Sequence, residues 1–279
     1  MDYAQLYSQI KLKGSFLCVG LDTDIAKIPS HLIEQALQKG ESKESAIFEF
    51  NRAIVDSTAK YTVSYKLNTA FYEASGWQGI LQLERTAQYI KENYPEIFLI
   101  ADAKRGDIGN TAAEYAKAFF EKMPFDAVTL SPYMGGDAVA PFLKYEGKWV
   151  IILALTSNAT AEEFEILKVD GQKPLYEVII RQADEWGTPQ NIMFVVGATR
   201  PEQLAQIRQI APQSFFLVPG VGAQGGKVED VAKAGMNSQC GLLVNSSRGI
   251  IYADSTERFA EVAAEKAAEL AAQMRIFLG

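Results

Sequence analysis

The chain has 279 residues, of which 48% are hydrophobic and 22% are charged, a composition typical of a globular protein with a sizeable core. Its net charge of −7 argues against a nucleic-acid or anionic-membrane surface, so an anionic substrate would need a local basic pocket. The sequence shows neither an apolar run of membrane length nor the layout of a signal peptide, and it predicts a cytoplasmic protein.

Residues that bind metals are scarce. Cys18 and Cys240 lie in or beside apolar runs without CxxC or Cys/His spacing, so we expect reduced thiols in the core. His31 is the single histidine and follows Pro29-Ser30 in a polar stretch, where we expect it to be exposed. This pattern argues against histidine-based triads and against metal sites built on histidine.

Short apolar runs alternate with helical stretches along the whole chain. Eight runs predict strands, over residues 16–21, 63–67, 98–101, 127–130, 149–155, 192–196, 215–218 and 241–244. Eight helices are expected near 42–60, 77–93, 111–122, 135–145, 174–186, 201–210, 226–234 and 255–277. Several strand runs are continuously apolar, as in a parallel sheet covered on both faces.

Eight βα units in a chain of this length predict an α/β fold, a single (β/α)₈ TIM barrel that forms one domain over residues 1–279. An open, doubly wound sheet is the alternative. It is less favoured because no GxGxxG follows the first strand and no change in composition divides two domains.

Charged residues follow three consecutive predicted strands, where a TIM barrel carries its chemistry. The first strand ends in Asp22, the second in Lys66, and the third in Asp102 and Lys104, which are two residues apart and should face the same side. Neighbouring strands would align these groups into an alternating row of acids and bases.

The third strand continues into Asp102-Ala103-Lys104-Arg105-Gly106-Asp107. Carboxylates on both sides of the Lys104 ammonium are expected to raise its pKa, so that it stays protonated and acts as a proton donor. A surface cluster of salt bridges is the alternative reading of the motif alone. Asp107 and Thr111 come after the turn at Arg105-Gly106 and should open the next helix at the barrel rim.

Two glycine-rich or polar segments follow the last two strands, Pro219-Gly-Val-Gly-Ala-Gln224-Gly-Gly and Asn245-Ser-Ser-Arg248-Gly. In TIM barrels these loops commonly bind phosphate, because glycines let backbone N–H groups approach its oxygens. Arg248 would supply charge and Gln224 a side-chain donor. The glycines could instead serve tight turns only.

Together, Asp102-x-Lys104-Arg105-x-Asp107-Ile-x-x-Thr111, Pro219-Gly-Val-Gly-Ala-Gln224 and the arginine after the last strand resemble the orotidine 5′-phosphate decarboxylase family, in its longer bacterial branch. The likeness covers nearly the whole chain. It implies decarboxylation of orotidine 5′-monophosphate to uridine 5′-monophosphate, the last step of de novo pyrimidine synthesis, without a cofactor or metal. The segment 23–40 has no counterpart in the compact members.

The resemblance also implies a role for each site residue. Catalytic roles fall to Lys104, which would protonate C6 of the pyrimidine, to Asp102 beside the substrate carboxylate, and to Asp107. Substrate binding would involve Asp22 and Lys66 at the ribose hydroxyls, Ser157 at the pyrimidine, and Pro219, Gln224 and Arg248 around the phosphate. Asp107 and Thr111 would reach across the interface of a homodimer into the partner's site.

Loss of CO₂ from C6 leaves a carbanion without an ordinary electron sink, and the sequence has no motif for thiamine, pyridoxal phosphate or metal. Electrostatic stabilisation by fixed charges would then carry the reaction. A Mg²⁺-dependent sugar-phosphate decarboxylase or aldolase of the same superfamily is one alternative, disfavoured because the second strand ends in Lys66 rather than an acid. A non-enzymatic nucleotide-binding barrel is the other.

Overall fold

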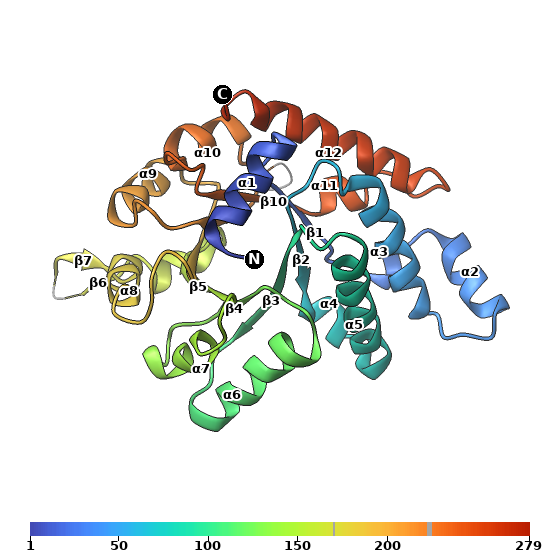
Figure 1. Cartoon of the computed structure of the whole chain (residues 1–279), viewed down its shortest axis with the longest axis horizontal. Coiled ribbons are helices and arrows are strands. Elements are labelled where there is room, and N and C mark those ends of the chain that lie inside the picture. Colours follow the sequence, from blue (N-terminus) through green and yellow to red (C-terminus); the bar gives the residue numbers. More distant parts are fainter. Residues whose placement is uncertain (170, 222–224) are drawn as a thin grey trace.

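Parallel strands close into an eight-stranded barrel in the computed structural model, which describes residues 1–169, 171–221 and 225–279 (Figure 1). The strands are β1 (Leu17–Gly20), β2 (Ser64–Asn68), β3 (Phe98–Arg105), β4 (Ala127–Leu130), β5 (Trp149–Leu155), β8 (Ile192–Val196), β9 (Phe216–Pro219) and β10 (Leu242–Ser246). Their order around the barrel is β1-β10-β9-β8-β5-β4-β3-β2. The predicted TIM barrel is confirmed, and the open-sheet alternative is wrong.

Helices surround the barrel (Figure 1). They are α1 (Tyr3–Lys13), α2 (Ser30–Gln38), α3 (Ser45–Thr58), α4 (Thr69–Glu73), α5 (Gly76–Asn93), α6 (Gly109–Lys117), α7 (Ala140–Leu143), α8 (Leu175–Ala183), α9 (Pro201–Ile210), α10 (Val228–Gly235), α11 (Arg248–Ile251) and α12 (Phe259–Arg275). Shorter elements are the 3₁₀-helices η1 (Ile25–Lys27), η3 (Gly136–Ala138) and η4 (Ala159–Glu163), the π-helix η2 (Ala118–Lys122), and an antiparallel pair of β6 (Lys168–Val169) and β7 (Lys173–Pro174). Among the helices of the described residues, none is long and apolar enough to cross a membrane.

The strands form where the sequence is continuously apolar, because both faces of the sheet are covered. All residues of β1, β4, β8 and β10 are buried. Three predicted strands have the same bounds in the structure, namely β4, β5 and β8. The third strand is longer than expected, since β3 continues to Arg105 through the charged motif.

Helix α1 closes the end of the barrel opposite the functional loops. Asp2 caps it by accepting from the N–H of Gln5 at 2.8 Å, and the Gln5 side chain accepts from the N–H of Asp2. Tyr3 packs against Trp149 at the start of β5 and against Phe215 just before β9. The amino ends of the strands are therefore plugged, which leaves the carboxyl ends open for a site.

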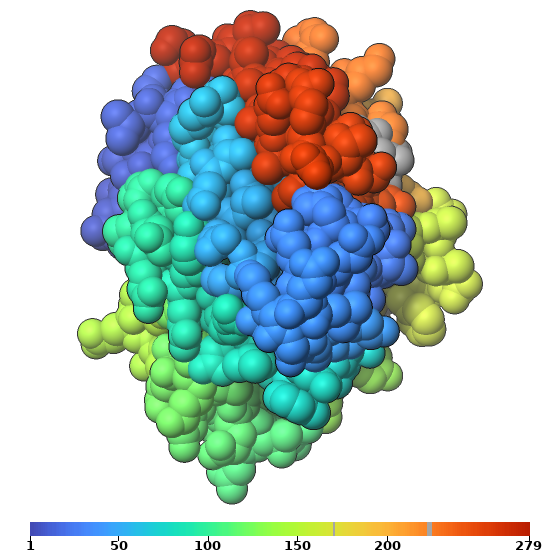
Figure 2. All heavy atoms as spheres, turned by 90° about the vertical axis from the view of Figure 1, so that its right-hand side faces the viewer, coloured from blue at the N-terminus to red at the C-terminus, as the bar shows by residue number. Residues whose placement is uncertain are grey.

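The segment of residues 23–40 forms η1 and α2 on the outside of the barrel, in blue in Figure 2. Ala36 is the one buried residue of α2. His31 is half-buried, with its ring 6.1 Å from that of Phe259, so the expectation that it is exposed is wrong. Cys18 and Cys240 are buried free thiols, as predicted.

Candidate active site

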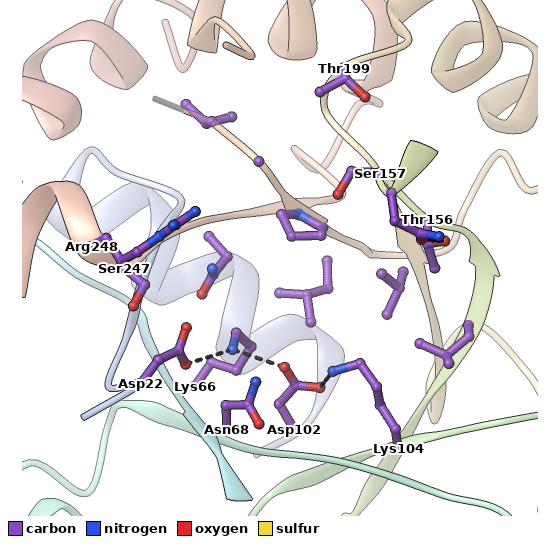
Figure 3. Close-up of a pocket in the computed structure, with 18 residues that line it drawn as sticks. Asp22, Lys66, Asn68, Asp102, Lys104, Thr156, Ser157, Thr199, Ser247 and Arg248 are labelled. Carbon is purple, nitrogen blue, oxygen red and sulfur yellow. Dashed lines mark hydrogen bonds and ion pairs between the residues drawn. The ribbon is translucent and has the colours of Figure 1, made fainter. Parts of the chain in front are cut away.

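A pocket of about 440 Å³ opens at the carboxyl ends of the barrel strands (Figure 3). Its apolar lining comes from Leu153, Val195 and Leu217 on β5, β8 and β9. Its polar lining includes Asp22, Lys66, Asn68, Asp102, Lys104, Thr156, Ser157, Thr199, Ser247 and Arg248. This is the end at which TIM barrels carry their active sites.

Four charged side chains form a continuous row across one wall of the pocket (Figure 3). The Nζ of Lys66 lies 3.2 Å from Oδ1 of Asp22 and 3.0 Å from Oδ2 of Asp102. The Nζ of Lys104 lies 2.6 Å from Oδ1 of Asp102. Because β1, β2 and β3 are neighbours in register, the predicted alternating row of acids and bases is present in the structure.

Burial and the neighbouring charges act in opposite directions on these groups. Burial alone would raise the pKa of Asp102, but the ammonium groups of Lys66 and Lys104 outweigh it and hold that pKa below its ordinary value. Burial alone would lower the pKa of Lys66, and the carboxylates of Asp22 and Asp102 instead raise it above its ordinary value. At neutral pH both groups therefore stay charged.

Lys104 differs from the other members of the row in exposure, because 49% of its side chain is accessible while only 5% of the Lys66 side chain is. Its side chain lines the pocket, and its ammonium lies beside the carboxylate of Asp102 (Figure 3). Lys66 is held between two carboxylates. Lys104 is thus the ammonium that a bound molecule can reach.

A bulge in β3 aims Lys104 into the pocket. The pairing of β3 with β4 shifts register between Ala101 and Arg105, and Lys104 has φ 46°. Its N–H donates to Oγ1 of Thr129 at 2.9 Å, and Thr129 in turn donates to Asp102 at 3.0 Å. Both charged side chains face one pocket, as the sequence predicted, but through a bulge rather than a regular pleat.

The opposite wall of the pocket is polar and less charged. Ser157 and Thr156 follow β5, as the sequence predicted for Ser157, and both line the pocket. Glu165 anchors this loop, since it accepts from the N–H and the hydroxyl of Thr156, each at 2.7 Å. The expected Ser157 is therefore placed on a loop that a carboxylate holds in position.

The last strands contribute the third side of the pocket. Pro219 and Arg248 line it, together with Gly220, Val221 and Ser247. Arg248 begins the short helix α11 and is exposed toward the pocket. Gln224 lies outside the described residues.

Two predicted site residues are not in the pocket of their own chain. Asp107 and Thr111 are not among the residues that line it, and Thr111 is exposed at the start of α6. The Asp107 carboxylate accepts from the N–H of Ile108 at 2.7 Å. Among the described residues, Asp102 is the one carboxylate that pairs with Lys104.

Six polar lining residues were not predicted as site residues from the sequence: Asn68, Thr156, Asn158, Thr199, Asn245 and Ser247. Asn68 ends β2 two residues after Lys66, so the reasoning that found Asp102 and Lys104 would also have found it. Asn245 lies within β10, which ends at Ser246, two residues after the predicted strand end at 244.

Comparison with known proteins places this barrel in a family. Residues 15–263 match the model of the orotidine 5′-phosphate decarboxylase / HUMPS family. Orotidine 5′-phosphate decarboxylase from Phocaeicola vulgatus is 55% identical over 274 residues, covering 98% of each chain. The corresponding protein of Parabacteroides distasonis is 53% identical and covers 100% of this chain and 96% of its own.

Solved structures agree. The OMP decarboxylase of Leishmania donovani superposes with a TM-score of 0.81 at 33% identity, covering 99% of this chain and 100% of its own. The fold, the position of the pocket and the sequence are all consistent with one family, and the chain belongs to the orotidine 5′-phosphate decarboxylase family.

Proposed function

We propose that this protein decarboxylates orotidine 5′-monophosphate to uridine 5′-monophosphate, in pyrimidine biosynthesis. The observation that carries the proposal is the row Asp22, Lys66, Asp102 and Lys104 along one wall of the pocket of a family barrel. The relatives of Phocaeicola vulgatus and Parabacteroides distasonis carry the name of this activity. The match of the family and of these relatives over nearly the whole chain also supports one decarboxylase domain over residues 1–279.

Lys104 and Asp102 are the proposed reacting partners of the substrate. As the bond between C6 and the carboxylate breaks, CO₂ leaves and the electron pair stays on C6, where it accepts a proton from Nζ of Lys104. The exposed ammonium stabilises the developing negative charge before the proton moves. Asp102 holds that ammonium at 2.6 Å, so little reorganisation accompanies the reaction. No cofactor takes part in this scheme.

Residues elsewhere in the pocket would bind the ribose, the pyrimidine and the phosphate of the nucleotide. Asp22 and Lys66 would bind the ribose hydroxyls at the buried end of the row. Ser157 would contact the pyrimidine, and Pro219, Gln224 and Arg248 would surround the phosphate. Because the phosphate does not react, its binding free energy can hold the substrate carboxylate against Asp102.

We also propose a homodimer whose two sites are shared, with Asp107 and Thr111 of each chain completing the site of the other. Both residues lie at the rim outside their own pocket. Beside them the rim exposes the large apolar side chains of Ile108, Tyr133 and Met134, which an interface would bury. A two-fold axis would bring each rim to the other subunit twice and identically.

An absorbance assay tests the function. In the presence of EDTA, the purified protein should convert orotidine 5′-monophosphate, so that the absorbance of this substrate falls with time. With Lys104→Ala the absorbance should stay constant. Activity that EDTA abolishes would favour the Mg²⁺-dependent alternative, although no observation on the chain favours it. Binding of the nucleotide without any absorbance change would favour a non-enzymatic binding barrel. The cytoplasmic location stays a prediction from the sequence.

A further inference from the structure

The loop that carries Asp22 is held from two sides by tyrosine hydroxyl groups. Tyr72 donates to the carbonyl oxygen of Leu21 at 2.9 Å, and Tyr252 donates to the carbonyl oxygen of Asp22 at 3.0 Å. The Tyr252 oxygen also accepts from the N–H of Asp24 at 2.6 Å. Side chains from α4 and from the end of α11 thus bond the main chain before, at and after this carboxylate.

A buried network orients the first of these tyrosines. Asn51 on α3 donates to the Tyr72 oxygen at 2.9 Å and to Oγ1 of Thr86 at 3.1 Å. Its own side-chain oxygen accepts from the hydroxyl of Thr23 at 2.5 Å. All four side chains are buried to 2% exposure or less, and each of these hydroxyl and amide groups has a partner. A satisfied polar network of this kind fixes one geometry in an apolar surrounding.

Aromatic packing orients the second tyrosine. The Tyr252 ring stacks on Phe50 with centroids 5.9 Å apart and an interplanar angle of 20°, and Phe50 stacks in turn on Phe259. Burial raises the pKa of Tyr252 to about 12, so its hydroxyl keeps its proton and remains a donor at neutral pH. A phenylalanine could keep the ring contacts while losing both main-chain bonds.

The carboxylate between these anchors has little else to fix it among the described residues. Within the described part of the chain its carboxylate accepts one hydrogen bond, from Nζ of Lys66 at 3.2 Å, which is long for a hydrogen bond, and 19% of the side chain is exposed. A small backbone shift at Asp22 would therefore separate it from Lys66 and from a ribose hydroxyl.

We propose that Tyr72 and Tyr252 are positioning residues that act through Asp22, by fixing the main chain from which its carboxylate reaches Lys66 and the nucleotide. The inference rests on the proposed function, because it assigns the ribose side of the same site. Neither tyrosine is among the residues that line the pocket, so both would act on the row only through the main chain at Asp22.

A double-mutant cycle tests the inference. Tyr252→Phe should lower kcat/KM for orotidine 5′-monophosphate about tenfold in the wild type. In an Asp22→Asn background the same change should lower it less than about twofold, because the group it positions is already lost. Tyr72→Phe should give the same pattern in the two backgrounds. If Tyr72→Phe does not fold, the cycle with Tyr252→Phe is sufficient to test the inference.

Tyr3→Phe is the matched control. It removes a tyrosine hydroxyl that donates to the carbonyl oxygen of Gln213 at 3.0 Å, at the plugged end of the barrel, and should leave kcat/KM unchanged. Equal losses from Tyr252→Phe in both backgrounds would overturn the inference, because they indicate a general structural effect. No loss in the wild type, or full activity of Asp22→Asn, would also overturn it.

The proposed function is separated from the inference by a second readout. If the wild type does not consume the substrate, the proposed function fails, and the same cycle is run on the dissociation constant for uridine 5′-monophosphate. Loss of affinity from Tyr252→Phe that disappears in the Asp22→Asn background supports the positioning role without turnover. Loss that is the same in both backgrounds contradicts it.

Discussion

Lys104 combines the two properties that a proton donor to a carbanion needs, an exposed ammonium and a buried counter-charge. Its side chain is half accessible, whereas the partner carboxylate of Asp102 is 10% exposed. The ammonium can therefore approach a bound ring without leaving its partner. A carbanion at C6 would meet a positive charge that is already in place.

Removal of this ammonium should affect turnover far more than binding. We expect Lys104→Ala to lower kcat by about a thousandfold or more, since it deletes both the proton and the stabilising charge. Binding of uridine 5′-monophosphate, measured by calorimetry, should remain. Lys39→Ala, at the exposed position just after α2, should keep wild-type activity. Activity of Lys104→Ala within tenfold of the wild type would contradict the assignment.

Asp102 should make the stability of the protein depend on pH. Its pKa in the folded protein lies below its ordinary value of 3.8, because two ammonium groups outweigh its burial. The stability that its ionised form contributes is then complete above the ordinary pKa. It declines as the pH falls below that value toward the lower pKa of the folded state.

Urea unfolding of wild type and Asp102→Asn from pH 7 to pH 3 checks this expectation. At pH 7 the variant should be less stable by about 3 kcal/mol, because two ammonium groups lose a buried partner. The difference should be constant down to about pH 5 and shrink below about pH 4. Asp137→Asn, at an exposed position, serves as a control. A difference that stays the same at all pH values would refute the linkage to Asp102.

At the scale of the element, the bulge in β3 has its own energetic signature. Lys104 adopts φ 46°, a conformation that is unfavourable for any residue with a Cβ atom and easy for glycine. We expect Lys104→Gly to be more stable to urea than Lys104→Ala by about 1 kcal/mol, although both are inactive.

At Ala103, the residue before Lys104, we expect a glycine to lower stability instead. Ala103 is buried in the same strand and has no positive φ, so Ala103→Gly should lower the free energy of unfolding by about 0.5–1 kcal/mol. If glycine were destabilising at position 104 as well, the positive φ would not be the source of strain. The charged motif would then occupy an ordinary strand.

Strands were easier to predict from the sequence than the elements around them. Continuous apolar runs gave the bounds of β4, β5 and β8, because a parallel sheet buries both faces. The end of β3 was missed because three of its last four residues, Asp102, Lys104 and Arg105, are charged. The bulge that accommodates them depends on pairing with β4.

Helix α1 was not predicted, although its sequence contains a helix-start pattern. Asp2 and Gln5 form a capping box, and Leu6 and Ile10 share its buried face. Helix α2 has a single buried residue, and the proline before it makes no side-chain cap. Neither an apolar face nor a capping residue therefore predicts this helix from the sequence. Local sequence thus located the core elements well and the peripheral ones less well.

The charged row could be predicted because its members follow consecutive strands, whose neighbourhood the topology fixes. The tyrosines behind Asp22 could not be predicted in this way. Tyr72 and Tyr252 are 180 positions apart, and Asn51 lies on a helix where its spacing among apolar residues gives no sign of a partner. Their convergence is a consequence of packing between helices, which only the folded chain shows.

At the scale of the whole molecule, the proposed homodimer predicts that each active site contains residues of two chains. Asp107 follows the turn after β3 and is not among the residues that line the pocket of its own chain. Exposed Ile108, Tyr133 and Met134 lie near it in the sequence or on the next loop. A second subunit that covers these side chains would bring its own Asp107 to the Lys104 of the first.

Subunit mixing tests this arrangement. Homodimers of Lys104→Ala and of Asp107→Ala should each be nearly inactive, because every site lacks one of the two groups. After exchange, a mixed dimer has one site with both groups intact and one with neither. Random pairing makes about half of the dimers mixed, each with one good site of two, so about a quarter of wild-type activity should return.

The matched control mixes Lys104→Ala with Asp102→Asn, whose groups pair at 2.6 Å within one chain. In that mixed dimer each site keeps one defect, so no activity should return however completely the subunits exchange. Recovery confined to the first mixture would place Lys104 and Asp107 in one site on different chains. If neither mixture recovers although exchange is verified by mass, Asp107 acts within its own subunit, and the rim residues do not complete a partner's site.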